Sequence, residues 1–88
     1  MAITSGQTTV GTSAIIIDGL STNPFRLHIH NNDNTADLFL GNGSVTTSTG
    51  LRLMKLDSIE LTINPGEALY AVSASGSHQV SWLRQTPD

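Results

Sequence analysis

The stretch Ser58-Ile59-Glu60-Leu61-Thr62-Ile63 places an apolar residue at every second position. An earlier stretch, residues 25–30, does the same with Phe25, Leu27 and Ile29. Side chains of a β-strand alternate between its two faces, so a period of two gives a strand with one apolar and one polar face. We therefore expect both stretches to be strands whose apolar faces share one core.

The same pattern recurs along most of the chain, between turns rich in Asn, Gly, Pro and Ser. No segment keeps helical spacing. We predict an all-β fold, a compact antiparallel β-sandwich or small flattened barrel of about 7–8 short strands, because a single sheet would leave its apolar face in water. The last two strands should form a hairpin around residues 74–77. The expected strands are 14–17, 25–30, 37–40, 58–63, 68–73 and 79–85, with local pairing at 51–56.

Charged residues are scarce, at 12% of the 88 residues, against about 25% in a typical globular protein. A surface with few charges loses less hydration free energy when another protein covers it. This favours a subunit that packs against other proteins. The alternative is that Thr, Ser and Asn side chains simply keep a free β-protein soluble.

Several classes of partner are disfavoured by the composition. The net charge is −3 and the four basic residues are scattered, so no basic patch is available for nucleic acid. Without cysteine there is neither a disulfide framework nor a thiolate metal site. No apolar run reaches membrane-spanning length, and a secretion signal is not recognisable. We expect a protein made in the cytoplasm, with neither nucleic acid nor a membrane as partner.

Residues 1–11 mix Thr, Ser, Gly and Gln with single apolar residues at Ile3 and Val10. We predict a flexible N-terminal arm at 1–11, followed by a single β-sandwich domain at 12–88. Such an arm can become ordered against a neighbouring subunit, with Ile3 and Val10 as contacts. The alternative is an ordinary frayed terminus.

A metal site is the most specific chemical hypothesis, because His28 and His30 should lie on one face of a strand. Metalloproteins of the cupin type use such a pair, together with a glutamate shortly after it and a further histidine in a second motif. Here no glutamate precedes Glu60, and His78 falls at a turn. We predict two surface histidines and no metal or other cofactor, with a cupin-like metalloenzyme as the alternative.

Catalytic groupings of other kinds are not apparent. A Gly-x-Ser-x-Gly nucleophile elbow does not occur, and the carboxylates mostly sit at turns, where acidic side chains commonly bond to backbone. We therefore predict a protein that is not an enzyme. Tyr70 and Trp82 are the candidates for ligand contact if exposed, and core residues if buried. Trp82 shares a strand face with Val80, which favours the core for it.

The order of several short pieces resembles a family of small bacteriophage structural proteins. In that family a strand ending in Asn-Asn leads to an apolar strand closed by Leu-Gly, then Val-Thr-Thr, a Gly, a Pro-Gly turn, Leu-Tyr-Ala and Ser-Gly. This chain departs from the pattern at 55–57, where similar chains often have a glycine-containing turn. The matching pieces are Leu27 to Asn32, Leu38 to Gly41, Val45-Thr46-Thr47, Gly50, Pro65-Gly66, Leu69-Tyr70-Ala71 and Ala74-Ser75-Gly76.

The resemblance implies a virion component, made in the host cytoplasm and placed on the exterior of the capsid. Its expected role is that of a decoration (head cement) protein that binds the major capsid protein and stabilises contacts between capsomers. Self-association into a trimer or dimer is expected, with Val45, Thr46 and Thr47 as further contact residues. The alternative is a tail or fibre-tip module that binds a receptor or carbohydrate through Tyr70 and Trp82.

Overall fold

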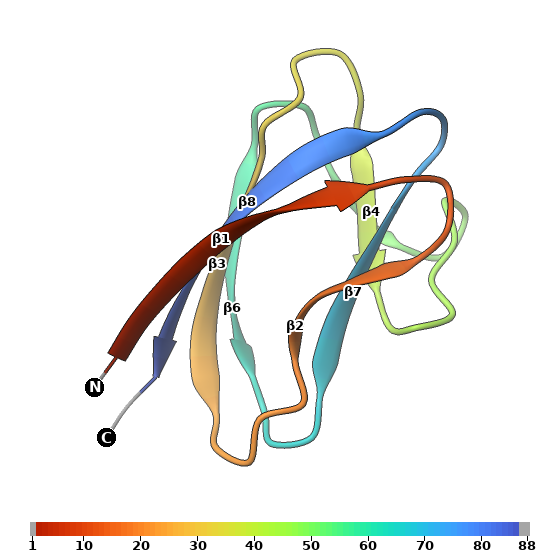
Figure 1. Ribbon diagram of the computed structural model, residues 1–88. Coiled ribbons are helices and arrows are strands. Elements are labelled where there is room, and N and C mark those ends of the chain that lie inside the picture. The colour runs from red at the N-terminus through yellow and green to blue at the C-terminus, as the bar shows by residue number, and fades with distance from the viewer. Residues whose placement is uncertain (1, 87–88) are drawn as a thin grey trace.

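The computed structural model describes residues 2–86 as eight β-strands in two stacked sheets (Figure 1). Within this range no helix is long and apolar enough to cross a lipid bilayer. The strands are β1 (Ala2–Val10), β2 (Ile15–Gly19), β3 (Phe25–Asn31), β4 (Leu38–Gly41), β5 (Leu51–Leu53), β6 (Ser58–Ile63), β7 (Ala68–Ser73) and β8 (His78–Thr86).

Sheet A has the strand order β1-β8-β3-β6, and sheet B has the order β2-β7-β4-β5. All neighbouring strands are antiparallel. This order in two four-stranded sheets is that of an eight-stranded jelly roll. The predicted all-β sandwich is confirmed, and the two separate sheets favour the sandwich over a closed barrel.

The alternation of apolar and polar residues in the sequence matches the burial of side chains in the structure. Phe25, Leu27 and Ile29 on β3 are buried, whereas Arg26 and His28 on the same strand are exposed. On β6 the partners of the buried residues are apolar as well, with Leu27 opposite Leu61 and Ile29 opposite Ile59. The core therefore lies between the sheets. Its buried members are Val10, Ile17, Phe25, Leu27, Ile29, Leu38, Leu40, Leu53, Ile63, Leu69, Ala71 and Val80.

The predicted flexible arm differs from the structure, because Ala2–Val10 is strand β1. It pairs with β8 over its whole length, from Ala2 opposite Thr86 to Val10 opposite His78. The segment has few apolar residues and so gives a weak strand signal on its own. The neighbouring strand β8 supplies the hydrogen-bond partners that residues 2–10 cannot provide locally.

The predicted hairpin at 68–85 is wrong. Strand β7 pairs with β2 and β4 in sheet B, whereas β8 pairs with β1 and β3 in sheet A. The connection at 74–77 thus crosses from one sheet to the other. Among the strands of residues 2–86, β4 and β5 are the only consecutive pair that share hydrogen bonds.

Asn31 is a fully buried polar residue at one end of the core. Its side-chain nitrogen lies 2.9 Å from the carbonyl oxygen of Ala36 and 3.3 Å from those of Leu53 and Met54. Its side-chain oxygen accepts a hydrogen bond from the backbone N–H of Asp33. Because Asn31 ends β3 and Leu53 ends β5, this amide joins sheet A to sheet B.

Candidate interaction surface

The two residues predicted as contacts in the N-terminal segment have opposite environments. Ile3 lies on the outer face of sheet A and is 65% exposed, whereas Val10 is fully buried in the core. The chain twists across the sandwich, so the far end of β1 is covered by sheet B while its beginning extends beyond it (Figure 1). Ile3 is therefore available to a partner, and the side chain of Val10 is not.

The loop that follows β4 contains the other predicted contacts. Val45 is buried, because it packs against the backbone of Gly41 and Gly50 on the outer side of sheet B. Thr46 and Thr47 are exposed. The backbone N–H of Gly50 donates to the carbonyl of Thr46 at 2.9 Å, which closes the loop as a compact turn. Val45 thus anchors the loop, and the two threonines are presented to solvent.

Tyr70 and Trp82 are not brought together. Trp82 lies on the inner face of sheet A, packs against the core, and covers Gly6 so closely that an added Cβ there would lie 2.8 Å from the indole ring. The predicted core role of Trp82 agrees with this position. Tyr70 lies on the outer face of sheet B, half-buried, with its ring beside Gly43. The two aromatics therefore cannot form one ligand platform.

His28 and His30 lie on the outer face of sheet A, as the alternation predicts. His28 Nδ1 is 3.8 Å from a carboxylate oxygen of Glu60, which also pairs with Arg26. His30 Nδ1 is 2.8 Å from the side-chain oxygen of Asn32. Among residues 2–86 no group of three or more His, Cys, Asp or Glu side chains is placed to hold a metal ion.

His78, by contrast, lies in a polar cluster that the sequence did not reveal. Its Nδ1 contacts the carboxylate of Asp33, and its Nε2 lies 2.7 Å from the carbonyl oxygen of Ser75. Both ring nitrogens face acceptors, so both must donate, and the Ser75 carbonyl followed by Asp33 raises the pKa of His78. Hydrogen bonds from Thr35, followed by those from His78, hold the pKa of Asp33 well below its usual range. Ser75 contributes no hydroxyl here, so the cluster joins two loops rather than forming a nucleophile.

An exposed apolar flank, formed by Leu51, Met54 and Leu56, was also missed by sequence reasoning. These side chains are 59%, 52% and 57% exposed, on the side of the sandwich where β5 and β6 are the outermost strands. Ile59 and Leu61 of β6 are half-buried behind them. One feature of the sequence could have indicated this flank. The four apolar residues within 51–56 do not alternate with polar residues as they would in a half-buried strand.

Leu56 has an unusual backbone for a leucine, with φ of 57°. Residues with side chains pay about 1–2 kcal/mol for this left-handed conformation, which glycine adopts freely. The turn is closed by the N–H of Asp57, which donates to the carbonyl of Met54 at 3.1 Å. The backbone at this position would suit glycine, but it carries an exposed apolar side chain.

A groove of about 360 Å³ lies between the ends of β4 and β6 and the beginning of β7, and none of its lining residues belongs to the apolar flank. It forms because β5 has only three residues and ends its pairing at Leu40, so Gly41 and Asn42 lack a neighbour from β5. Leu61, Ile63 and Leu69 supply the apolar part of its lining. Of these three, Ile63 and Leu69 are buried core residues and Leu61 is half-buried.

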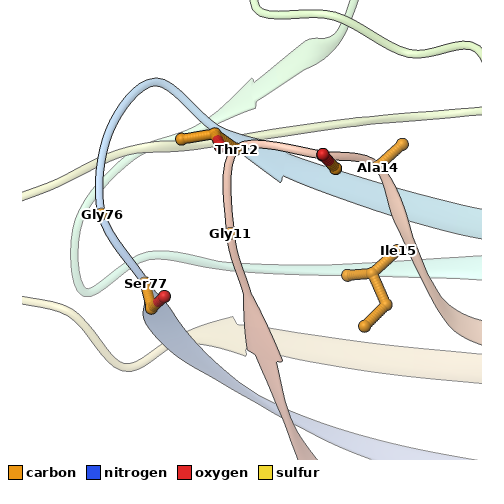
Figure 2. Close-up of a pocket in the computed structure, with 7 residues that line it drawn as sticks. Gly11, Thr12, Ala14, Ile15, Gly76 and Ser77 are labelled. Atoms are coloured by element: carbon orange, nitrogen blue, oxygen red, sulfur yellow. The ribbon is translucent and has the colours of Figure 1, made fainter.

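A second hollow, of about 560 Å³, lies between the β1–β2 and β7–β8 connections (Figure 2). Its side chains are small, apart from Ile15, which points into it. The lining offers backbone and hydroxyl groups and no titratable side chain. It consists of Gly11, Thr12, Ser13, Ala14, Ile15, Gly76 and Ser77.

Comparison with known proteins finds a structure of similar fold but no matching protein family. No protein-family model matches the chain, and no curated protein shows significant sequence similarity to it. Among solved structures, a protein of the disulfide-linked pili that form Bacillus endospore appendages is similar, with a TM-score of 0.59. The alignment covers 99% of this chain and 87% of the pilus protein, at 15% sequence identity. This likeness establishes a shared fold.

Proposed function

We propose that this protein is a non-enzymatic structural subunit of a bacteriophage virion, a decoration protein that binds the outside of the head. Its partner would be the major capsid protein, and its role would be to stabilise the contacts between capsomers. The proposal continues the family resemblance of the sequence. It is supported by the fold, by the scarcity of charge and above all by the exposed apolar flank.

The fold supports this class by analogy. Jelly rolls occur in viral capsid proteins, in lectins and in cupins, and one fold hosts many functions. The pilus protein with a similar structure is itself part of an assembled fibre. Its pili are disulfide-linked, whereas the present chain has no cysteine. Copies of this chain therefore cannot be joined to one another by disulfide bonds.

The apolar flank is the observation that carries the proposal. Leu51, Met54 and Leu56 are each more than half exposed, and Arg52 and Lys55 lie between them in the chain. Protein interfaces combine an apolar centre with a polar rim, and exposed apolar patches are typical of binding surfaces.

Decoration would act through many copies. Each subunit would add a modest binding free energy across a boundary between capsomers, so that rupture of the shell must also break these contacts. Subunits that hold more than one attachment point gain further by avidity. Thr46 and Thr47 would serve as secondary contacts, because the loop that presents them is internally hydrogen-bonded and loses little conformational entropy on binding.

The tail-tip alternative is supported by Tyr70. This side chain is half-exposed on the outer face of sheet B, opposite Ile16 and beside the 42–50 loop. Trp82 gives it no support, since the indole packs against the core. Loss of glycan or receptor binding on changing Tyr70→Ala would favour this alternative.

The decoration proposal is tested by mixing the purified protein with empty expanded heads of its phage and sedimenting them. Leu56→Gly removes an exposed side chain at a position whose φ suits glycine, so the fold should be retained. Leu20→Gly is the matched control, because Leu20 also has a positive φ, of 61°, and is 68% exposed, at the opposite end of the sandwich.

We expect the wild type and Leu20→Gly to co-sediment with heads, and Leu56→Gly to bind about tenfold more weakly, the scale of losing one buried leucine contact. Absence of wild-type binding at saturating concentration would refute decoration. Equal binding by the two variants would refute the role of the apolar flank. Copy number in whole virions gives a second check, because a shell protein is present in hundreds of copies and a tail-tip protein in a handful.

A further inference from the structure

The four outermost strands of the two sheets differ in how they are protected. An edge strand offers unpaired backbone N–H and C=O groups to any extended chain, and proteins commonly shield such edges with charges, proline, bulges or short length. Strand β5 has three residues, β6 carries Glu60, and β2 is interrupted by a register shift between Ile16 and Asp18. These three edges therefore carry at least one protective feature each.

Strand β1 carries none of these features. Its nine residues, Ala2–Val10, contain no charged residue and no proline. The pairing with β8 runs without a register shift from one end to the other, so the free edge is regular as well. Ile3, Ile15 and Ile16 are exposed on this side of the sandwich. The β1 edge is thus a long, straight and uncharged template for another strand.

We infer that the β1 edge is a homodimer interface, in which β1 of one copy pairs antiparallel with β1 of a second copy. Full overlap of residues 2–10 with themselves places Gly6 on the twofold axis. It sets Ile3 opposite Thr9 of the second copy and Ser5 opposite Gln7. The two A sheets would then join into one continuous eight-stranded sheet.

This register is self-complementary in two respects. Ile3, Ser5, Gln7 and Thr9 share the outer face of sheet A, because each pairs with an outward-facing residue of β8. The twofold axis pairs outer-face residues of one copy with outer-face residues of the other. The outer faces of the two A sheets therefore lie on the same side of the joined sheet. No two like charges face each other across the junction, since β1 has no charge.

A second copy is the occupant that this edge favours. Twofold isologous pairing is the commonest symmetry of soluble oligomers, and it requires a surface that matches itself. A head-to-tail arrangement would need β1 to pair with the edge of β6, which carries Glu60 against an uncharged partner, and it would continue into an open polymer. The inference goes beyond the proposed function and does not depend on it, because pairing of β1 does not involve the β5–β6 flank.

The test is the oligomeric state over a concentration series, measured by analytical ultracentrifugation. Ser5→Lys combined with Gln7→Lys places lysines opposite each other in the proposed pair. Both residues are exposed, so the fold of one copy should be unchanged. Ser58→Lys combined with Thr62→Lys is the matched control, since these exposed residues lie on the outer face of β6, at the other edge of the same sheet.

We expect a wild-type dimer, a control variant that still dimerises, and a β1 variant whose dimer dissociation constant rises about tenfold or more. A wild type that stays monomeric at all concentrations would overturn the inference, and so would open-ended polymers. Dimerisation lost in the β6 variant and kept in the β1 variant would overturn it too.

A crosslinking measurement keeps the inference testable if the lysine variant fails to fold. The chain has no cysteine, so a single introduced thiol reports on one position. Ser5→Cys and Gln7→Cys chains mixed under oxidising conditions should form a disulfide-linked heterodimer several-fold faster than either chain alone, because positions 5 and 7 face each other. Equal rates in the mixture and the separate chains would contradict the register.

Discussion

The two ends of the sandwich both hold polar side chains between the sheets, but only one end satisfies their hydrogen-bonding groups. At the end formed by the 31–37 and 74–77 loops, Asn31 uses its amide nitrogen and oxygen, and Asp33 accepts from Thr35, Ala36 and His78. These contacts link β3, β5 and β8. This end is held by a complete polar network.

At the opposite end, Asp18 of sheet B pairs with Arg84 of sheet A at 3.2 Å. The Arg84 guanidinium also lies 3.9 Å from the centre of the Phe25 ring. Asp18 Oδ2 and Arg84 Nε are nevertheless buried without a hydrogen-bond partner within residues 2–86, as is the indole nitrogen of Trp82 in the middle of sheet A. An unsatisfied buried polar atom costs about 1–3 kcal/mol. We therefore expect burial of polar groups to stabilise this sandwich more at the end where the network is satisfied than at the end where it is not.

The largest effect is expected at the satisfied end, from Asn31→Ala. The substitution removes the side-chain donor to the carbonyls of Ala36, Leu53 and Met54, of which only that of Met54 is known to keep a second donor, the N–H of Asp57, and it leaves the N–H of Asp33 without its acceptor. We expect a loss of about 3 kcal/mol of unfolding free energy, or roughly 10–20 °C in melting temperature. Thermal unfolding followed by circular dichroism measures it.

Asn32→Ala is the control for this substitution, because Asn32 is the same residue type, one position later, and is exposed. Its bonds to His30 and Ser81 lie in solvent, and its loss should cost about 0.5 kcal/mol or less. Equal destabilisation by the two variants would show that the amide network of Asn31 does not hold this end together.

The position of most strands could be predicted from the sequence, whereas their partners could not. The alternation in 25–30 and 58–63 depends only on which residues must be buried, and it located β3 and β6 correctly. The connection at 74–77 has the residues of a hairpin turn yet crosses between the sheets. Turn chemistry bends the chain but does not decide whether it returns to the same sheet, which depends on long-range packing.

The candidate surface was predicted less well, for a physical reason of the same kind. Ile3 and Val10 are seven positions apart, so alternation puts them on opposite faces once residues 2–10 are known to form a strand, and that strand depends on pairing with β8. The positive φ of Leu56 could not be predicted either, because leucine rarely adopts that conformation and its residue type gives no sign of it. The His78–Asp33 contact joins residues 45 positions apart, which no local pattern reports.

A smaller effect is expected at the incomplete end, from Asp18→Ala. This change leaves the partly buried Arg84 without its carboxylate, and we expect a loss of about 1–2 kcal/mol, because the pair has one hydrogen bond and is partly exposed. Glu60→Ala breaks the exposed pair with Arg26 and should cost about 0.5 kcal/mol or less.

The double variant Asp18→Leu with Arg84→Met sharpens the comparison between the two ends. Replacing both partners of an incompletely satisfied pair by apolar side chains should restore or exceed the wild-type unfolding free energy, measured by urea denaturation. No apolar residue at position 31 can do the same, since the carbonyls there belong to the backbone. A double variant less stable than Asp18→Ala would show that the pair at this end stabilises the fold despite its unpaired atoms.

The smallest effect is the pH dependence of the satisfied end. The pKa of His78 is raised by folding, so its contribution is complete below about pH 6.5, the ordinary pKa of histidine, and is lost as the pH rises through the raised value. The pKa of Asp33 is lowered, so its contribution is complete above about pH 4 and is lost as the pH falls further.

The wild-type melting temperature should therefore be highest between these limits and decline above neutral pH. His78→Gln should remove the decline on the alkaline side, whereas His28→Gln, on the outer face of sheet A, should keep it. A decline that survives in His78→Gln would place the responsible titration at another group of the molecule.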